Sequence, residues 1–170
     1  MSGKNIKKIF SVITFIIVYG LITNVNAMGE LKVEKQSIIN ASPSTVWKMI
    51  GDYNHLDVWH PVVVNSSVDR DGNKEGAIRL LTLGDGATIT EKLIAHSNND
   101  MTYTYAITES PLPINNYVST INVSSSGDGK TTVTWSSTFN ASGVEDEKAI
   151  EIISGIYDAG LGSLNKHFTN

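Results

Sequence analysis

Hydrophobic and polar side chains alternate along most of the chain after residue 30, which is typical of strands that bury one face. In the segment 101–107, Met101, Tyr103, Tyr105 and Ile107 share one side, and mostly threonines lie between them. Because successive side chains of a strand point to opposite faces, one face of this segment is apolar and the other polar. Short connecting loops predict antiparallel neighbours. Seven segments have this strand character: 31–40, 61–68, 77–83, 87–95, 101–108, 117–124 and 131–139.

Three other segments have helical features. Residues 44–50 form a short helix in which Ser42 supplies the N-cap and Pro43 the first position, where the missing N–H group does no harm. Residues 54–59 form a second short helical turn, ended by the proline that follows. Residues 145–168 carry apolar side chains at helical spacing and acidic residues in the first turn, which predicts a long amphipathic helix.

Glycines are the unusual feature of the long helix. Gly155, Gly160 and Gly162 each cost about 1 kcal/mol relative to alanine inside a helix. Two explanations remain open: a sheet or a ligand approaches the helix closely, or the helix bends or breaks near Gly160.

These elements together predict an α+β protein with one domain. An antiparallel sheet with one apolar face and one long amphipathic helix buries both apolar surfaces by folding the sheet around the helix. The two short helices between the first and second strands would then cover one end of a cavity.

The first 27 residues have the order of a secretory signal peptide. Lysines precede an apolar run at 9–22, and Val-Asn-Ala at 25–27 supplies a small-residue cleavage pattern. The run is shorter than the ~20 residues that a membrane-spanning helix needs. We expect cleavage after Ala27, a periplasmic or secreted protein formed by residues 28–170, and no stable membrane span after cleavage. An uncleaved N-terminal anchor is the alternative.

Charge and composition exclude several classes of function. The chain has 13 Lys and Arg against 17 Asp and Glu, and Lys4, Lys7 and Lys8 lie in the leader, so the domain is acidic. Such a surface does not attract a phosphate backbone, and we expect no nucleic-acid partner. The chain has no cysteine, which excludes disulfides and thiolate chemistry. The histidines lack the spacing of a metal site, so we expect no metal. We also expect no cofactor.

One pair of opposite charges lies on an apolar strand face. If residues 84–86 form a three-residue loop, Arg79 faces Glu91 across a hairpin, on the same side as Leu81 and Ile89. A two-residue loop would break this pairing. Two roles remain open. Arg79 binds a ligand oxygen while Glu91 orients the ligand or moves a proton, or the residues form an ion pair that only stabilises the sheet.

The other candidate residues would line a cavity between the sheet and the long helix, open near Trp59 and the loop at 112–113. Tyrosine hydroxyls can orient an apolar ligand, although inward tyrosines often serve packing alone. His60 is a candidate at the cavity mouth, and otherwise part of a structural stop. The predicted ligand contacts are Trp59, His60, Arg79, Glu91, Tyr103, Tyr105, Tyr117, Trp135, Ile152 and Ile156. If the protein is an enzyme, Arg79 and Glu91 are its predicted catalytic residues.

The element order resembles the helix-grip fold of the START-like superfamily, also known as SRPBCC or polyketide cyclase/dehydrase. The chain also carries a set of short motifs: Trp59-His60-Pro61, GAIRLLTL at 76–83, Gly86, ITEKL at 89–93, Tyr103-Thr104-Tyr105 and LPINNY at 112–117. Together they look like the MxaD-type branch of exported bacterial proteins in this superfamily, and the likeness covers roughly residues 33–168. Plant lachrymatory-factor synthases are similar in fold and share the arginine and glutamate that match Arg79 and Glu91.

The resemblance implies a cavity for a small hydrophobic or amphipathic ligand. The superfamily contains carriers, receptors and enzymes, so it does not decide between them. Our leading hypothesis is a ligand-binding protein. One alternative is a cyclase, dehydratase or isomerase that uses Glu91 as acid or base and Arg79 to stabilise negative charge. The other is an accessory protein of a periplasmic dehydrogenase, because some members of the branch are associated with periplasmic methanol oxidation.

The leader generates the first testable prediction. The mature protein is expected to begin at Met28, because the peptidase pattern ends at Ala27. An intact-mass measurement of the protein from the periplasmic fraction checks this. A mass that still includes residues 1–27 would favour the membrane anchor.

Overall fold

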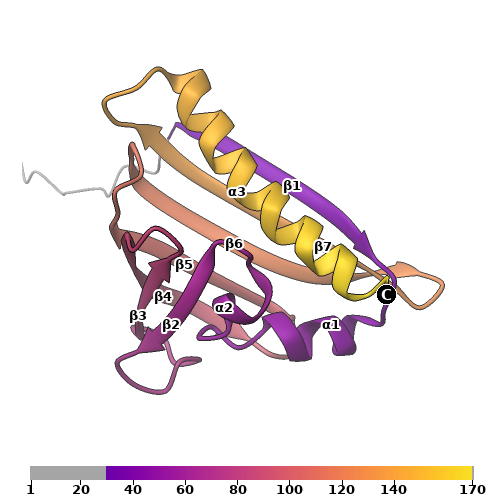
Figure 1. Ribbon diagram of the computed structural model, residues 1–170. Helices are drawn as coiled ribbons and strands as arrows, with labels where there is room; N and C mark the ends of the chain where they lie inside the picture. The colour runs from indigo at the N-terminus through magenta and orange to yellow at the C-terminus, as the bar shows by residue number, and fades with distance from the viewer. Residues whose placement is uncertain (1–29, 170) are drawn as a thin grey trace, which may run out of the picture.

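Seven antiparallel strands form one open sheet that curves around a long helix (Figure 1). The computed structural model describes residues 30–169, so the leader expected at 1–27 lies outside them. The strand order is β1-β7-β6-β5-β4-β3-β2. The elements are β1 (Leu31–Ile39), α1 (Pro43–Ile50), α2 (Leu56–Trp59), β2 (Val63–Val68), β3 (Ile78–Leu83), β4 (Thr88–Ser97), β5 (Thr102–Glu109), β6 (Ile114–Gly127), β7 (Lys130–Ala141) and α3 (Asp146–His167).

The expected α+β helix-grip architecture is confirmed. Each predicted strand and helix is present, and the main difference is β6, which begins at Ile114 rather than Tyr117. Ile114 pairs with Ala141 before the register shifts, and Asn116 has a φ of 52° at this irregularity. An asparagine tolerates this left-handed conformation, so the strand continues through a position that looks like a break in the sequence. No helix among residues 30–169 is long and apolar enough to cross a membrane.

The short helices begin and pack for local reasons. Ser42 caps α1 by accepting a hydrogen bond from the backbone N–H of Thr45 at 3.3 Å, and Pro43 occupies the first turn. Val46, Trp47 and Ile50 form the buried face of α1. Figure 1 shows α1 and α2 together at one end of the curved sheet, with α3 running along β1 and β7. In this arrangement α1 and Tyr53 cover Tyr103 on the concave face of β5, and α2 and α3 lie over the rest of the concave face of β3 to β5.

The helix α3 is continuous through its glycines, so a break near Gly160 does not occur. A Cβ atom on Gly160 would lie 2.6 Å from Cδ2 of His60 and 2.9 Å from Cζ3 of Trp135. These distances are shorter than van der Waals contact, so close approach explains this glycine. A Cβ atom on Gly155 or Gly162 would meet nothing within 4 Å, and nothing in the structure explains those two.

The glycines therefore generate a matched set of substitutions. Gly160→Ala is expected to lower the free energy of unfolding by about 1–2 kcal/mol, because overpacking against two rings outweighs the gain in helix propensity. Gly155→Ala and Gly162→Ala are the controls, and each should raise it by up to about 1 kcal/mol. Urea unfolding of the three variants measures the differences. Equal effects at all three positions would contradict the close contact.

Candidate functional site

The hairpin of β3 and β4 brings Arg79 and Glu91 face to face. Its connection is the expected three-residue loop, since the N–H of Leu83 donates to the carbonyl of Ala87 at 2.8 Å. Arg79 pairs with Glu91 in the strand register, and Leu81 with Ile89. A two-residue loop is thereby excluded, and both charges point to the apolar face of the sheet.

The two side chains form a direct ion pair that is almost fully buried, with exposed fractions of 1% and 4%. Nε and Nη2 of Arg79 donate to Oε2 of Glu91 at 2.9 and 2.5 Å. Nη1 donates to the backbone carbonyl of Tyr53, and the guanidinium lies over the Tyr53 ring at 3.9 Å from its centroid. All three guanidinium nitrogens of Arg79 therefore have protein acceptors.

Only one of the two carboxylate oxygens of Glu91 accepts hydrogen bonds from the described residues. Among residues 30–169, its hydrogen bonds all reach Oε2, and Oε1 accepts none. Burial raises the pKa of the Glu91 carboxyl above its ordinary value, and the Arg79 cation opposes that rise. A protonated Glu91 would leave Arg79 as an unpaired buried cation, so the pair is ionised at neutral pH. Oε1 is then an anionic acceptor without a partner in the part of the chain that the structure describes.

A cavity of about 250 Å³ lies between α3 and the concave face of the sheet. Its wall is almost entirely aliphatic and aromatic, and its polar side chains include Glu91, His60 and Tyr105. The lining residues are Leu56, His60, Val62, Val63, Leu81, Leu83, Ile89, Glu91, Tyr105, Ile107, Leu112, Tyr117, Trp135, Ile152, Ile153 and Ile156.

The structure brings seven of the ten predicted contact residues to this wall, and places Trp59, Arg79 and Tyr103 elsewhere. Trp59 is 3% exposed and packs behind Trp135, with ring centroids 5.4 Å apart. Arg79 lies behind Glu91. Tyr103 lies under α1, where its ring stacks on that of His96. A ligand contact through these three side chains is therefore not supported by their positions, although binding itself stays a prediction.

Sequence reasoning did not single out much of the aliphatic wall. Leu81 and Ile89 share the face of the ion pair, which was a usable signal. Val62 and Leu112 come from loops, where no alternation of polar and apolar residues indicates which way a side chain points. Both are partly or largely exposed and, with the half-buried Ile152, they lie at the mouth of the cavity. The opening is thus next to the 112–113 loop, as expected, but not at Trp59.

His60 is deep in the protein rather than at the mouth, with an exposed fraction of 2%. Its Nε2 atom lies 3.0 Å from the carbonyl oxygen of Ile156 on α3. Because a carbonyl only accepts, Nε2 carries the proton, and burial lowers the pKa of the ring so that it is neutral. Nδ1 is consequently an acceptor, and it has no partner among the described residues.

A hydrogen-bond network joins the polar side chains in the deeper part of the cavity wall. The hydroxyls of Tyr117 and Tyr157 lie 2.6 Å apart, and the indole N–H of Trp135 donates to Ser119 at 3.0 Å and to the Tyr105 hydroxyl oxygen at 3.2 Å. Burial, and then the charge of Glu91, raise the pKa of Tyr105 well above its ordinary value. Tyr105 is therefore a phenol whose own proton has no acceptor within residues 30–169.

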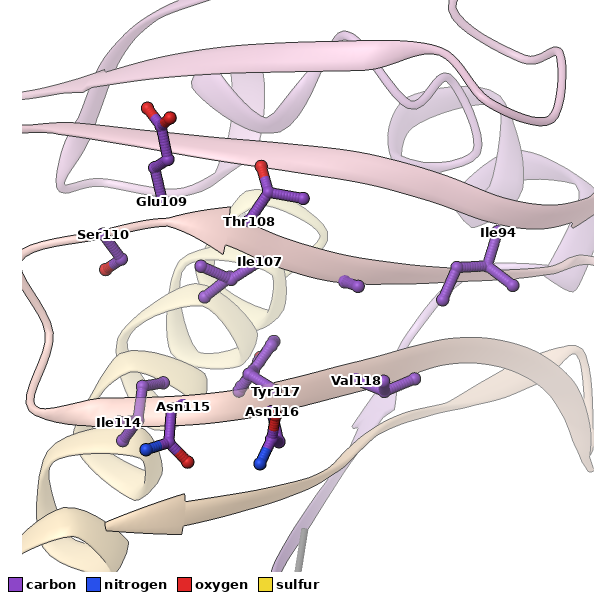
Figure 2. Close-up of a pocket in the computed structure, with 11 residues that line it drawn as sticks. Ile94, Ile107, Thr108, Glu109, Ser110, Ile114, Asn115, Asn116, Tyr117 and Val118 are labelled. Carbon is purple, nitrogen blue, oxygen red and sulfur yellow. The ribbon is translucent and has the colours of Figure 1, made fainter. Parts of the chain in front are cut away.

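A second hollow, of about 760 Å³, lies on the outer face of the sheet. The pairing of β5 and β6 ends at Ala106 and Val118, and beyond that point the strands separate. Figure 2 shows Ile107 and Tyr117 at the separated strands, with α3 visible behind them. These two residues line both hollows and so form the wall between them. The outer groove carries no buried charge among its lining residues, which makes the inner cavity the better candidate site.

The ion pair generates a stability prediction. Arg79→Met or Glu91→Leu leaves one buried charge unpaired, and each should lower the free energy of unfolding by about 3–5 kcal/mol. The double variant removes both charges and should recover most of that loss, a coupling that a double-mutant cycle of denaturant unfolding measures. Strictly additive effects would show that the two charges do not interact.

Comparison with known proteins agrees with this architecture. The family described as polyketide cyclase / dehydrase and lipid transport matches residues 30–169. No curated protein sequence matches the chain. The solved structure of XoxI from Bacillus cereus is 36% identical over 82% of this chain and 96% of its own, with a TM-score of 0.77.

An uncharacterised protein from Bacillus thuringiensis is 35% identical over 82% of this chain and its own full length, also with a TM-score of 0.77. A protein from Nitrosospira multiformis is 25% identical over 82% of this chain and 97% of its own, with a TM-score of 0.73. The chain therefore belongs to the polyketide cyclase/dehydrase and lipid transport family, as its sequence indicated.

Proposed function

We propose that the protein binds a small, mainly apolar molecule in the cavity beneath α3. The observation that carries the proposal is an apolar cavity that remains beside a tightly packed aromatic core and exposes one buried carboxylate. Protein interiors are close-packed, so a space of about 250 Å³ is far larger than an ordinary packing defect. It lies just below the ~300–1,000 Å³ of typical small-molecule pockets, which favours a ligand smaller than a drug-sized compound.

The position of the mouth supports exchange of such a ligand. Val62 and Leu112 come from loops, and Ile152 comes from the exposed flank of α3, so small movements of these segments would widen the opening. We also propose, from the signal-like leader, that this binding takes place outside the cytoplasm.

Catalysis is the second candidate function, and one observation favours it. Glu91 carries a raised pKa and an unpartnered oxygen in an apolar cavity, which suits a general base. The geometry changes the role foreseen for Arg79, because its nitrogens are engaged by Glu91 and Tyr53 and do not reach the cavity. An enzyme would therefore use Glu91 with Tyr105 rather than with Arg79. A ligand that copurifies unchanged supports the carrier, and one that is transformed on incubation supports the enzyme.

Ligand binding is tested with a fluorescent apolar probe. Saturable binding, displaced by small aromatic compounds, is expected for the unmodified protein. Ile152→Trp places a large ring at the mouth and should weaken probe binding by about tenfold or more, because it fills space that the ligand would occupy. Native mass spectrometry of the protein from its own periplasm would then identify a retained ligand.

Ile150→Trp is the matched control on the same helix, since Ile150 is half-buried but does not line the cavity. It should leave probe affinity within about twofold of the unmodified protein. Absence of saturable binding, or equal effects of the two tryptophans, would contradict a ligand site in this cavity.

A further inference from the structure

The polar atoms that remain free in the cavity wall differ in kind. Oε1 of Glu91 and Nδ1 of His60 are acceptors without partners among the described residues, and the first carries negative charge. The hydroxyl of Tyr105 supplies a donor, because it accepts from Trp135 and keeps its own proton free. Arg79, the only cation near the site within residues 30–169, is turned away from the cavity.

Glu91 and Tyr105 lie close enough to act on one ligand group. Leu93 faces Tyr105 across the β4–β5 ladder, so Glu91 is the diagonal neighbour of Tyr105 on the same face. The guanidinium that binds Glu91 also lies 5.4 Å from the centroid of the Tyr105 ring. A group placed between them would meet an anionic acceptor on one side and a phenolic donor on the other.

We propose that the cavity selects an uncharged apolar molecule that carries a hydroxyl group, which donates to Oε1 of Glu91 and accepts from the hydroxyl of Tyr105. A hydroxyl is the simplest group that is both donor and acceptor. An ether or a ketone can only accept, and it would leave the Glu91 oxygen without a partner in an apolar site. A carboxylate would bring a second negative charge beside Glu91 while Arg79 is already neutralised, so the site excludes it.

His60 does not offset this preference. The ring is neutral, so it adds no attraction for an anion, and its unpartnered Nδ1 atom is itself buried. The proposal therefore concerns the single hydroxyl at Glu91. This inference rests on the proposed function, because it specifies the ligand of the same cavity.

Four compounds that share the naphthalene ring test ligand binding in the cavity and the hydroxyl preference separately. We would titrate the protein at pH 7 with 2-naphthol, 2-methoxynaphthalene, naphthalene and 2-naphthoate, and follow the indole N–H signal of Trp135 by NMR. 2-Naphthol should bind at least about tenfold more tightly than 2-methoxynaphthalene, the scale of one lost hydrogen bond to a charged group. 2-Naphthoate should bind more weakly than naphthalene.

Each result bears on one proposal. If none of the compounds shifts the Trp135 signal, the cavity does not bind such ligands and the proposed function fails. If all four bind with similar affinity, or 2-naphthoate binds most tightly, the cavity binds ligands but the hydroxyl preference is wrong.

Variants locate the preference within the cavity. Tyr105→Phe removes the donor and should reduce the ratio of 2-naphthol to 2-methoxynaphthalene affinity by about threefold or more. Tyr103→Phe, on the same strand and face but outside the cavity, is the control and should leave the ratio unchanged. In the Arg79→Met/Glu91→Leu double variant, if it folds, the ratio of 2-naphthol to 2-methoxynaphthalene affinity should fall to about one. An unchanged ratio in this variant would overturn the role of Glu91. Should that variant not fold, the tyrosine pair and the four compounds still decide the proposal.

Discussion

The buried ion pair of Arg79 and Glu91 is the constraint on which the site depends. Two charges in an apolar core are tolerated only when their geometry is good and their remaining hydrogen-bonding groups are satisfied. Here the hairpin register places Arg79 opposite Glu91. The carbonyl of Tyr53 accepts a hydrogen bond from the third guanidinium nitrogen, and the Tyr53 ring covers the cation. The pair thereby ties the loop after α1 to the centre of the sheet, and it fixes which oxygen of Glu91 stays free.

The cavity exists because α3 and the sheet touch closely at one place and separate at another. At Gly160 the helix backbone approaches His60 and Trp135 with no room for a side chain. One to two turns earlier, Ile152, Ile153 and Ile156 meet the sheet across open space. The stacking of Trp135 on Tyr157, with ring centroids 4.3 Å apart, and the hydrogen bond of Tyr157 to Tyr117 hold the wall between these regions. A rigid contact beside an unfilled space is what a preformed binding site requires.

Local sequence signals determined much of this architecture. Alternation identified the seven strands, and Ser42 and Pro43 located the start of α1. A three-residue loop at 84–86, one of two loop lengths that were open, predicted the register of Arg79 and Glu91 that the structure has. These predictions succeed because each depends on neighbours within one strand, one helix turn or one hairpin. The start of β6 is the exception, since the left-handed Asn116 interrupts the local pattern without ending the strand.

The assignment of side chains to the cavity depended on tertiary structure. Tyr103 and Tyr105 share a face and are indistinguishable by alternation, yet α1 and Tyr53 cover the first while the second faces the cavity. The sequence also could not show that Arg79 would be turned toward Tyr53, or that Gly160 would face His60, because those contacts join segments distant in the chain. By itself the sequence determined the fold, which follows from local periodicity, and indicated the family through a resemblance of its motifs. It also offered the ion pair of Arg79 and Glu91 as the consequence of a three-residue hairpin loop. Only the packing of α1, α2 and α3 on the curved sheet decided which polar atoms remain free for a ligand.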